Sequence, residues 1–252
     1  MPIYTGKVKS ILITQPKPET DKSPYFDLAK KFNLKIDFRP FIHVEGISAK
    51  DFRKEKIHPG DFTAVIFNSR NSIDHYFRIC NEMRFEVPTT MKYFCITEST
   101  ALYLQKYVQF RKRKIFFGNQ TMPELLEILK KHKTEKFIFP CSDARQEDVT
   151  KFLAENGFEF AEAIIYRTVC SDLSDLAEVN YDIIAFFSPS GIKSLYLNFP
   201  SFLQNNTRIA AFGPTTHKAV LDAGLNLDIQ APMPKIPSMT MAIEEYVKQV
   251  NK

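Results

Sequence analysis

The chain has 252 residues, 44% of them hydrophobic and 25% charged, a composition that excludes intrinsic disorder and allows a sizeable core. Its formal net charge of +5 is compatible with an acidic small-molecule ligand and with ordinary solubility, whereas nucleic-acid binding needs a concentrated basic face. No apolar run is long enough to span a bilayer, so we expect no membrane partner. Without a concentrated basic face, we expect no nucleic-acid partner either.

The chain is predicted to start with a strand, a helix and a second strand. Residues 11–16 form a short apolar run that ends in proline, which predicts a buried strand and then a loop. Ser23 followed by Pro24 predicts a helix start, since serine is a good N-cap and proline fits the first helical position. This helix ends near Asn33, and residues 34–43 are predicted to form the second strand.

Two further segments each predict a buried strand, a polar turn and a helix. They are residues 62–73 (FTAVIFNSRNSI) and residues 93–101 (YFCITESTA). The basic run at 111–114 comes just before a strand-like segment at 115–117, and we interpret it as a solvated turn.

The same plan recurs in the second half of the chain. Residues 137–140 repeat the strand ending in proline, 147–156 repeat the helix with Gly157 as its C-cap, and 158–168 repeat the second strand. The repeat therefore predicts two structural units built alike.

The two strand–turn–helix segments are repeated as well. Residues 181–192 (YDIIAFFSPSGI) resemble 62–73, and 209–217 (IAAFGPTTH) resemble 93–101, with a helix ending at Gly224. Alternating strands and helices predict an α/β fold with two Rossmann-like, doubly wound domains, each containing a parallel sheet. Ligands of such sheets bind at the carboxyl ends of the strands. If the lobes face each other, one cleft is lined by the turns at 15–16, 68–72, 97–100, 140–145, 188–191 and 213–216.

The cysteines and histidines show no spacing typical of a metal site or a redox motif. We therefore expect no metal, reduced thiols, no secretory signal and a cytoplasmic location. Glycine-rich phosphate-binding motifs are also absent from the sequence, so no nucleotide cofactor is expected.

The repeated motifs resemble those of the uroporphyrinogen-III synthase family. Residues 186–191 (FFSPSG) and 210–216 (AAFGPTT) resemble its two most recognisable C-terminal motifs, and 165–168 (IYRT) resembles a characteristic strand. The order and spacing of these motifs extend the resemblance over nearly the whole chain. Gln15 and Thr97 depart from it, because the family usually has arginine and glycine there.

This resemblance implies two lobes joined by a two-stranded β linker. One lobe would comprise residues 1–35 and 169–252, the other 44–160, and the linker strands would be 36–43 and 161–168. The implied enzyme is a monomeric, cofactor-free hydro-lyase. It cyclises hydroxymethylbilane, a linear tetrapyrrole with eight carboxylates, to uroporphyrinogen III, with inversion of ring D and loss of water.

The implied site has one candidate catalytic group and several candidate carboxylate ligands. The phenol of Tyr166 can donate a hydrogen bond to the departing hydroxyl, although it can instead be a packed strand residue. Arg145 and Arg208 are candidate carboxylate partners or ordinary surface charges. Helix N-termini and nearby hydroxyls also bind anions. The residues expected there, which are otherwise plain helix-capping residues, are Ser69, Ser99, Thr100, Ser188, Ser190, Thr215 and Thr216.

Two other interpretations remain open at this point. A non-catalytic, two-lobed tetrapyrrole-binding or regulatory relative would account for the departures at Gln15 and Thr97. A doubly wound protein that binds a sugar or nucleotide is less well supported, because the glycine-rich phosphate-binding motifs are missing from the sequence.

Overall fold

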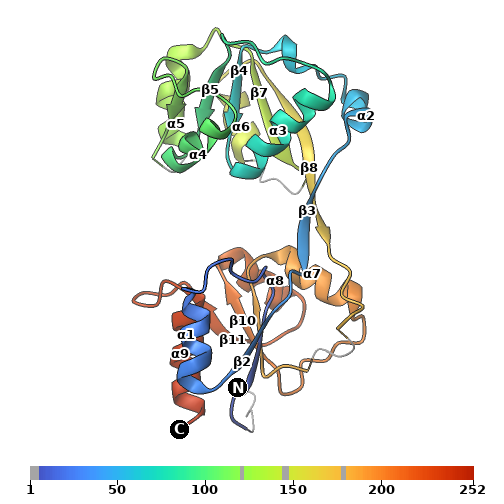
Figure 1. Ribbon diagram of the computed structural model, residues 1–252, viewed down its shortest axis with the longest axis vertical. Helices are drawn as coiled ribbons and strands as arrows, with labels where there is room; N and C mark the ends of the chain where they lie inside the picture. The colour runs from blue at the N-terminus through green and yellow to red at the C-terminus, as the bar shows by residue number, and fades with distance from the viewer. Residues whose placement is uncertain (1–5, 120–121, 144–147, 177–179) are drawn as a thin grey trace. The chain divides into compact units, whose positions relative to one another are not determined.

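The structure is a computed structural model that describes residues 6–119, 122–143, 148–176 and 180–252. The chain divides into two compact units: unit 1 is Met1–His43 with Val169–Lys252, and unit 2 is Val44–Thr168 (Figure 1). It passes between the units twice, within β3 (Ile42–Gly46) and within β8 (Phe160–Cys170). These two strands are hydrogen-bonded neighbours.

Unit 1 contains a five-stranded parallel sheet with the strand order β11-β10-β9-β1-β2. Helices α1 and α9 lie side by side on one face, where Lys31 of α1 pairs with Glu244 of α9, and α7 and α8 cover the other face (Figure 1). Successive residues of β1 alternate between the two cores: Ile11 and Ile13 pack with α1 and α9, and Leu12 packs with α7 and α8. The elements are β1 (Ser10–Ile13), α1 (Pro24–Phe32), β2 (Lys35–Phe38), β9 (Ile183–Phe186), α7 (Pro189–Asn198), β10 (Arg208–Phe212), α8 (Pro214–Asp222), β11 (Leu227–Ala231) and α9 (Met239–Val250).

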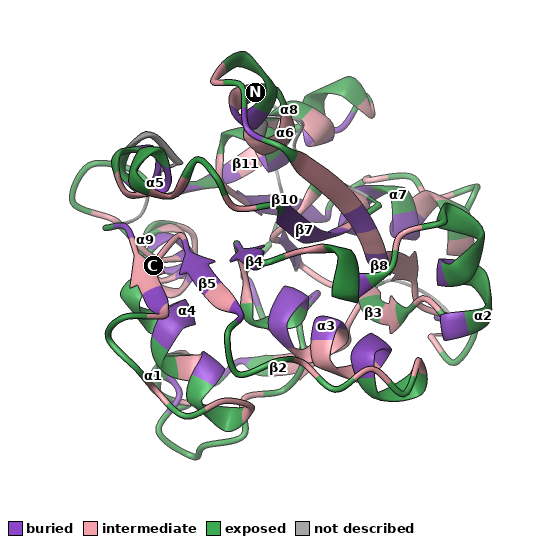
Figure 2. Ribbon diagram, turned by 90° about the horizontal axis from the view of Figure 1, so that it is seen from above, coloured by how far each residue is buried: buried purple, intermediate pink, exposed green. Residues whose placement is uncertain are grey.

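Unit 2 contains a six-stranded sheet with the order β3-β8-β7-β4-β5-β6. One face packs against α2, α3 and α4, and the other packs against α5 and α6. Its central strands β4 and β7 are buried over nearly their whole length (Figure 2). The remaining elements are α2 (Ala49–Phe52), η1 (Arg53–Glu55), η2 (Pro59–Asp61), β4 (Ala64–Phe67), α3 (Arg70–Glu82), β5 (Lys92–Cys95), α4 (Glu98–Tyr103), η3 (Leu104–Lys106), β6 (Ile115–Phe117), α5 (Met122–Leu129), η4 (Lys130–His132), β7 (Phe137–Ser142) and α6 (Asp148–Glu155).

The two sheets share one topology, which confirms the α/β class predicted from the repeat. Reading β6-β5-β4-β7-β8 in unit 2 against β11-β10-β9-β1-β2 in unit 1 pairs β5, β4, β7 and β8 with their predicted counterparts and adds the pair β6 and β11. The matched strands β4 and β9 also lead into helices with the same serine N-cap. Ser69 has φ −158° and ψ 164°, and Ser188 has φ −157° and ψ 155°.

Residues 34–43 do not form the single strand that the sequence predicted. They form β2, which pairs with β1, and then the start of β3, which pairs with β8. Pro40 lies in the break between the two strands, and the break suits a residue that has no N–H to donate to a strand ladder.

The predicted turn at Pro140 is also different, because β7 continues through this proline to Ser142. The N–H of Phe137 donates to Glu159 O at 2.9 Å, on the β8 side. By alternation, the nitrogen of Pro140 faces β4, whose pairing with β7 covers only Phe137 and Ile138. The proline therefore removes no ladder hydrogen bond, and the strand extends past it.

Two equivalent turns of the repeat start their helices in different ways. Thr97, the N-cap of α4, has φ −127°, and its Oγ1 accepts a hydrogen bond from the Thr100 N–H at 3.2 Å. Gly213, the N-cap of α8, has φ 87° and ψ 151° and makes no side-chain cap. Residues other than glycine rarely adopt the conformation found at Gly213, whereas Thr97 is in ordinary extended backbone.

We expect Gly213→Ala to lower the free energy of unfolding by about 1–3 kcal/mol, the usual cost of a Cβ in this backbone region. The cause would be backbone strain alone, because an added Cβ meets no atom within 4 Å. Urea denaturation measures the change. Thr97→Gly is the matched control and should cost only a few tenths of a kcal/mol, since glycine is an acceptable N-cap. A neutral Gly213→Ala would contradict the described turn.

Candidate functional site

Polar residues of unit 2 gather at the carboxyl ends of β7, β4 and β5, beside the middle of β8. Ser142, the last residue of β7, is paired with Tyr166 of β8. β4 and β5 end in register, and each is followed two residues later by a helix N-cap, Ser69 and Thr97 respectively. The Ser69 hydroxyl lies 3.4 Å from the Tyr166 hydroxyl, and either can donate to the other. The sequence-predicted Ser69 and Tyr166 are thus brought together.

Tyr166 is enclosed by protein, with only 7% of its surface exposed. Its ring stacks on that of His75, with the centroids 5.1 Å apart and the planes at 20°. Burial raises the pKa of Tyr166, and the hydrogen bond with Ser69 opposes this increase in part. The phenol therefore stays protonated well above neutral pH and can act as a hydrogen-bond donor.

Ser69 has a structural role that is compatible with ligand binding. Its Oγ accepts the N–H of Ser72 at 3.1 Å, and the Ser72 hydroxyl lies 3.3 Å from the Ser69 N–H, which forms a capping box at the start of α3. Accepting this hydrogen bond leaves the hydroxyl proton of Ser69 able to point elsewhere. Ser69 can thus cap α3 and contact a ligand at the same time.

The first turn of α4 presents one of its two predicted hydroxyls to solvent. Ser99 is exposed, whereas Thr100 is 5% exposed. Both lie within hydrogen-bond distance of the Thr97 hydroxyl, at 3.0 Å for Ser99 and 2.9 Å for Thr100. Ser99 can therefore meet a ligand through its side chain, whereas Thr100 is buried and its N–H already donates to Thr97 Oγ1.

Unit 1 repeats this arrangement at the carboxyl ends of β1, β9 and β10. Ser188 follows β9 and caps α7, its Oγ accepting the Gly191 N–H at 3.3 Å. An added Cβ at Gly191 would lie 3.9 Å from Ser188 Oγ and 4.0 Å from the Thr14 hydroxyl, so both hydroxyls border this glycine. Ser190 is half-buried in the first turn of α7.

At the start of α8, the groups that can bind an anionic ligand are mainly backbone N–H donors. Pro214 has no N–H, so the N–H groups of Thr215 and Thr216 are the first donors that α8 presents. Thr215 is exposed, but Thr216 is only 1% exposed. A contact by Thr216 would therefore come from its backbone N–H.

Arg208 does not lie with these residues, which corrects the sequence-based expectation. It is the first residue of β10, at the amino end of the strand, and is 1% exposed. Its guanidinium donates to Gly6 O at 2.9 Å and to the Tyr246 hydroxyl at 3.3 Å. Because parallel strands place their amino ends at one edge, Arg208 is on the side of the sheet opposite Ser188 and has a structural role. Arg145 lies outside the described residues.

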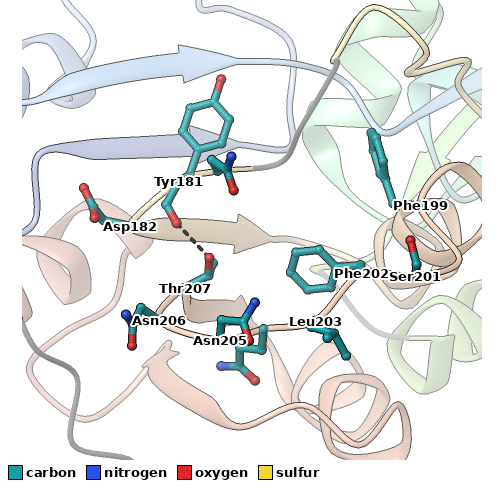
Figure 3. Close-up of a pocket in the computed structure, with 11 residues that line it drawn as sticks. Tyr181, Asp182, Phe199, Ser201, Phe202, Leu203, Asn205, Asn206 and Thr207 are labelled. Carbon is teal, nitrogen blue, oxygen red and sulfur yellow. Dashed lines mark hydrogen bonds between the residues drawn. The ribbon is translucent and has the colours of Figure 1, made fainter.

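A cavity of about 570 Å³ also lies at this opposite edge of unit 1. It is bordered by the segments before β9 and β10, where the Thr207 hydroxyl donates to Tyr181 O at 2.9 Å (Figure 3). Phe202 lines its wall, and amides surround it. Of the predicted site residues that the structure describes, none lines this cavity, so it is not part of the candidate site.

Sequence reasoning missed His75, because it considered the histidines only as possible metal ligands and found no metal-ligand spacing among them. In the structure, its Nδ1 accepts a hydrogen bond from Arg78 Nε at 3.2 Å, while its ring contacts Tyr166. The only available signal was the i, i+3 spacing of His75 and Arg78, which places them on one face of a helix.

The four cysteines are reduced thiols, and Cys80, Cys95 and Cys141 are buried. Burial raises the pKa of the Cys80 and Cys95 thiols to about 12, so they are poor nucleophiles. Among the helices in the described ranges, none has the length and apolarity needed to cross a membrane.

Comparisons with known proteins agree with this architecture. The family model described as Uroporphyrinogen-III synthase HemD matches residues 25–241. A uroporphyrinogen-III synthase of Chlorobaculum parvum is 23% identical over 96% of this chain and all of its own length. One from Saccharomyces cerevisiae is 30% identical over 44% of this chain and 46% of its own length.

Solved structures share the fold. The uroporphyrinogen-III synthetase of Helicobacter pylori matches with a TM-score of 0.62 and 17% identity, over 96% of this chain and 99% of that one. A mutant uroporphyrinogen III synthase of Thermus thermophilus matches with a TM-score of 0.57 and 12% identity, over the same shares. With the family model matching most of its length, the chain belongs to the uroporphyrinogen-III synthase family.

Proposed function

We propose that this protein cyclises hydroxymethylbilane to uroporphyrinogen III, with inversion of ring D and loss of water. Family membership supports the reaction class. The observation that carries the proposal for this chain is the Tyr166 phenol, which is buried at the carboxyl edge of the unit 2 sheet with its hydroxyl 3.4 Å from that of Ser69.

In the proposed first step, the hydroxyl of hydroxymethylbilane leaves as water. Tyr166 donates a hydrogen bond to the departing oxygen, which weakens the carbon–oxygen bond and stabilises the leaving group. The pKa of Tyr166 is raised by burial, so the donor form persists at neutral pH. Loss of water gives an azafulvene, and ring closure with inversion of ring D follows without any redox change.

The eight carboxylates of the substrate require many donors, and each unit has helix N-termini and hydroxyls at the carboxyl edge of its own sheet. We propose that Ser69, Ser99, Ser188, Ser190 and Thr215 bind carboxylates through hydroxyls or backbone N–H groups, and that Thr216 does so through its N–H group. Thr100 instead supports the start of α4, because its N–H donates to Thr97 Oγ1. Hydrogen bonds to charged groups contribute about 1.5–3 kcal/mol each. Several such contacts at helix N-termini would hold the tetrapyrrole without many arginines.

A non-catalytic, tetrapyrrole-binding relative is the second candidate. Its support came from the departures at Gln15 and Thr97, but Thr97 caps α4 in an ordinary backbone conformation and leaves the turn undistorted. The test supplies hydroxymethylbilane to the protein and measures the ratio of type III to type I porphyrin after oxidation. The enzyme yields mainly type III, whereas type I dominance would reject the proposed activity.

We also propose that the protein is a monomer in the cytoplasm. Four reduced thiols suit a reducing compartment. The proposed domain division assigns residues 1–35 and 169–252 to one lobe, 44–160 to the other, and 36–43 with 161–168 to the linker. The crossing of the chain within β3 and β8 supports a two-stranded linker. Residues 36–38, however, lie in β2 of the unit 1 sheet, so the first linker strand is β3 and not the whole of 36–43.

We expect Tyr166→Phe to lower kcat by about 10-fold to 100-fold, at the low end of general-acid effects, because the substrate loses water readily unaided. The initial rate of type III formation measures this loss. Tyr93→Phe is the matched control, since it removes the phenol oxygen from another strand tyrosine of unit 2 that is 5% exposed. An unimpaired Tyr166→Phe enzyme would refute the catalytic role.

We expect Ser188→Ala to raise KM for hydroxymethylbilane by about 10-fold, which corresponds to the loss of one hydrogen bond to a charged group. Ser238→Ala is the control, because Ser238 caps α9 through the same type of contact, with its Oγ 3.2 Å from Met241 N. Both variants should lose about 1 kcal/mol of stability. Equal KM values in the two variants would mean that Ser188 only caps its helix.

A further inference from the structure

Arg78 of α3 joins two strands of unit 2 next to the proposed catalytic tyrosine. Its Nη2 donates to Ile47 O at 2.7 Å and to Ile165 O at 3.2 Å. The Ile47 N–H also donates to Ile165 O, at 2.9 Å. Ile165 immediately precedes Tyr166, so the peptide group that leads into the tyrosine is held by two donors.

The guanidinium of Arg78 is itself fixed from two sides. Its Nη1 pairs with Glu82 Oε1 at 2.5 Å, and the other carboxylate oxygen of Glu82 accepts the Ala49 N–H at 3.0 Å. On the opposite side it covers Gly46, where an added Cβ would lie 2.6 Å from Arg78 Nη2. Glycine at position 46 therefore leaves the space that the arginine fills.

His75 extends this network to the ring of Tyr166. Arg78 Nε donates to His75 Nδ1, and since arginine cannot accept, this nitrogen carries no proton. Burial lowers the pKa of His75 and the Arg78 charge lowers it further, while the carboxylate of Asp74 acts in the opposite direction. The neutral imidazole lies against the Tyr166 ring, 5.1 Å between centroids.

We propose that Arg78 and His75 are positioning residues that together set the orientation of Tyr166. Arg78 holds the peptide in front of the tyrosine, and His75, aligned by Arg78, holds the face of its ring. The phenol oxygen is thereby directed towards Ser69 and the carboxyl edge of the sheet. This inference rests on the proposed function of Tyr166.

The test compares Arg78→Lys and His75→Phe with the wild-type full-length chain. Lysine keeps the charge, but the three protons on its single nitrogen cannot replace the four contacts that the arginine makes with His75, Glu82 and the two carbonyls. We therefore expect kcat to fall by about 10-fold to 100-fold, the scale of a misplaced group. KM should stay within about threefold. His75→Phe keeps a stacked ring and should retain more activity than His75→Ala. Arg84→Lys is the control, because Arg84 is exposed and lies just after α3.

A second measurement needs no substrate. In protein labelled with ¹³C-tyrosine, the ring signal missing from Tyr166→Phe identifies Tyr166. This signal should shift in Arg78→Lys and in His75→Ala. In the wild type it should also move on acidification, with a midpoint below the ordinary histidine pKa of about 6.5, because a protonated His75 repels Arg78. His75→Phe should abolish this movement.

The outcomes separate this inference from the proposed function. If the wild type produced no type III isomer, the proposed function would fail, while the tyrosine signal would still decide whether the network orients Tyr166. A folded Arg78→Lys with an unchanged Tyr166 signal and unchanged kcat would overturn the positioning role. Lower stability with an unchanged signal would overturn it as well, since the arginine would then act only in folding.

Discussion

Burial of both faces of each sheet determines where this protein can place polar chemistry. The central strands β4 and β9 are buried at every position, because helices cover both faces of each sheet and leave neither face open to solvent. Polar side chains must gather where the strands end, and parallel strands end together at one edge. The hydroxyls of Ser69 and Tyr166 meet at this edge of unit 2, and Ser188 lies at the same edge of unit 1.

The internal repeat made most of the fold predictable. Local signals were sufficient for the helix that starts at Ser23 and for the caps at Ser69 and Ser188, because an N-cap depends on residues only two or three positions away. The strand breaks were harder to predict. A proline indicates a missing donor, but only the pairing partners decide whether that donor is needed, so Pro40 lies between two strands and Pro140 lies within one.

The site was only partly predictable, for a related reason. Tyr166 and the helix starts lie in recognisable motifs, whereas the partners of Arg78 come from Ile47 and Ile165, which are far from it in sequence. No spacing rule brings such groups together; only the completed sheet does. Arg208 shows the opposite error, because its charge suggested a ligand contact, but its place at the start of a parallel strand puts it at the wrong edge.

The discontinuous make-up of unit 1 has a consequence for synthesis on the ribosome. Unit 2 is one continuous stretch of chain and can fold as soon as it has emerged. In unit 1, by contrast, β1 pairs with β9 through Ile11 and Ile183, and Val8 is hydrogen-bonded to Asn251. The strand β1 can pair early with β2, but its other neighbour, β9, follows about 170 residues later in the chain. Until β9 has been synthesised, one edge of β1 lacks its partner and is open to pairing with another chain.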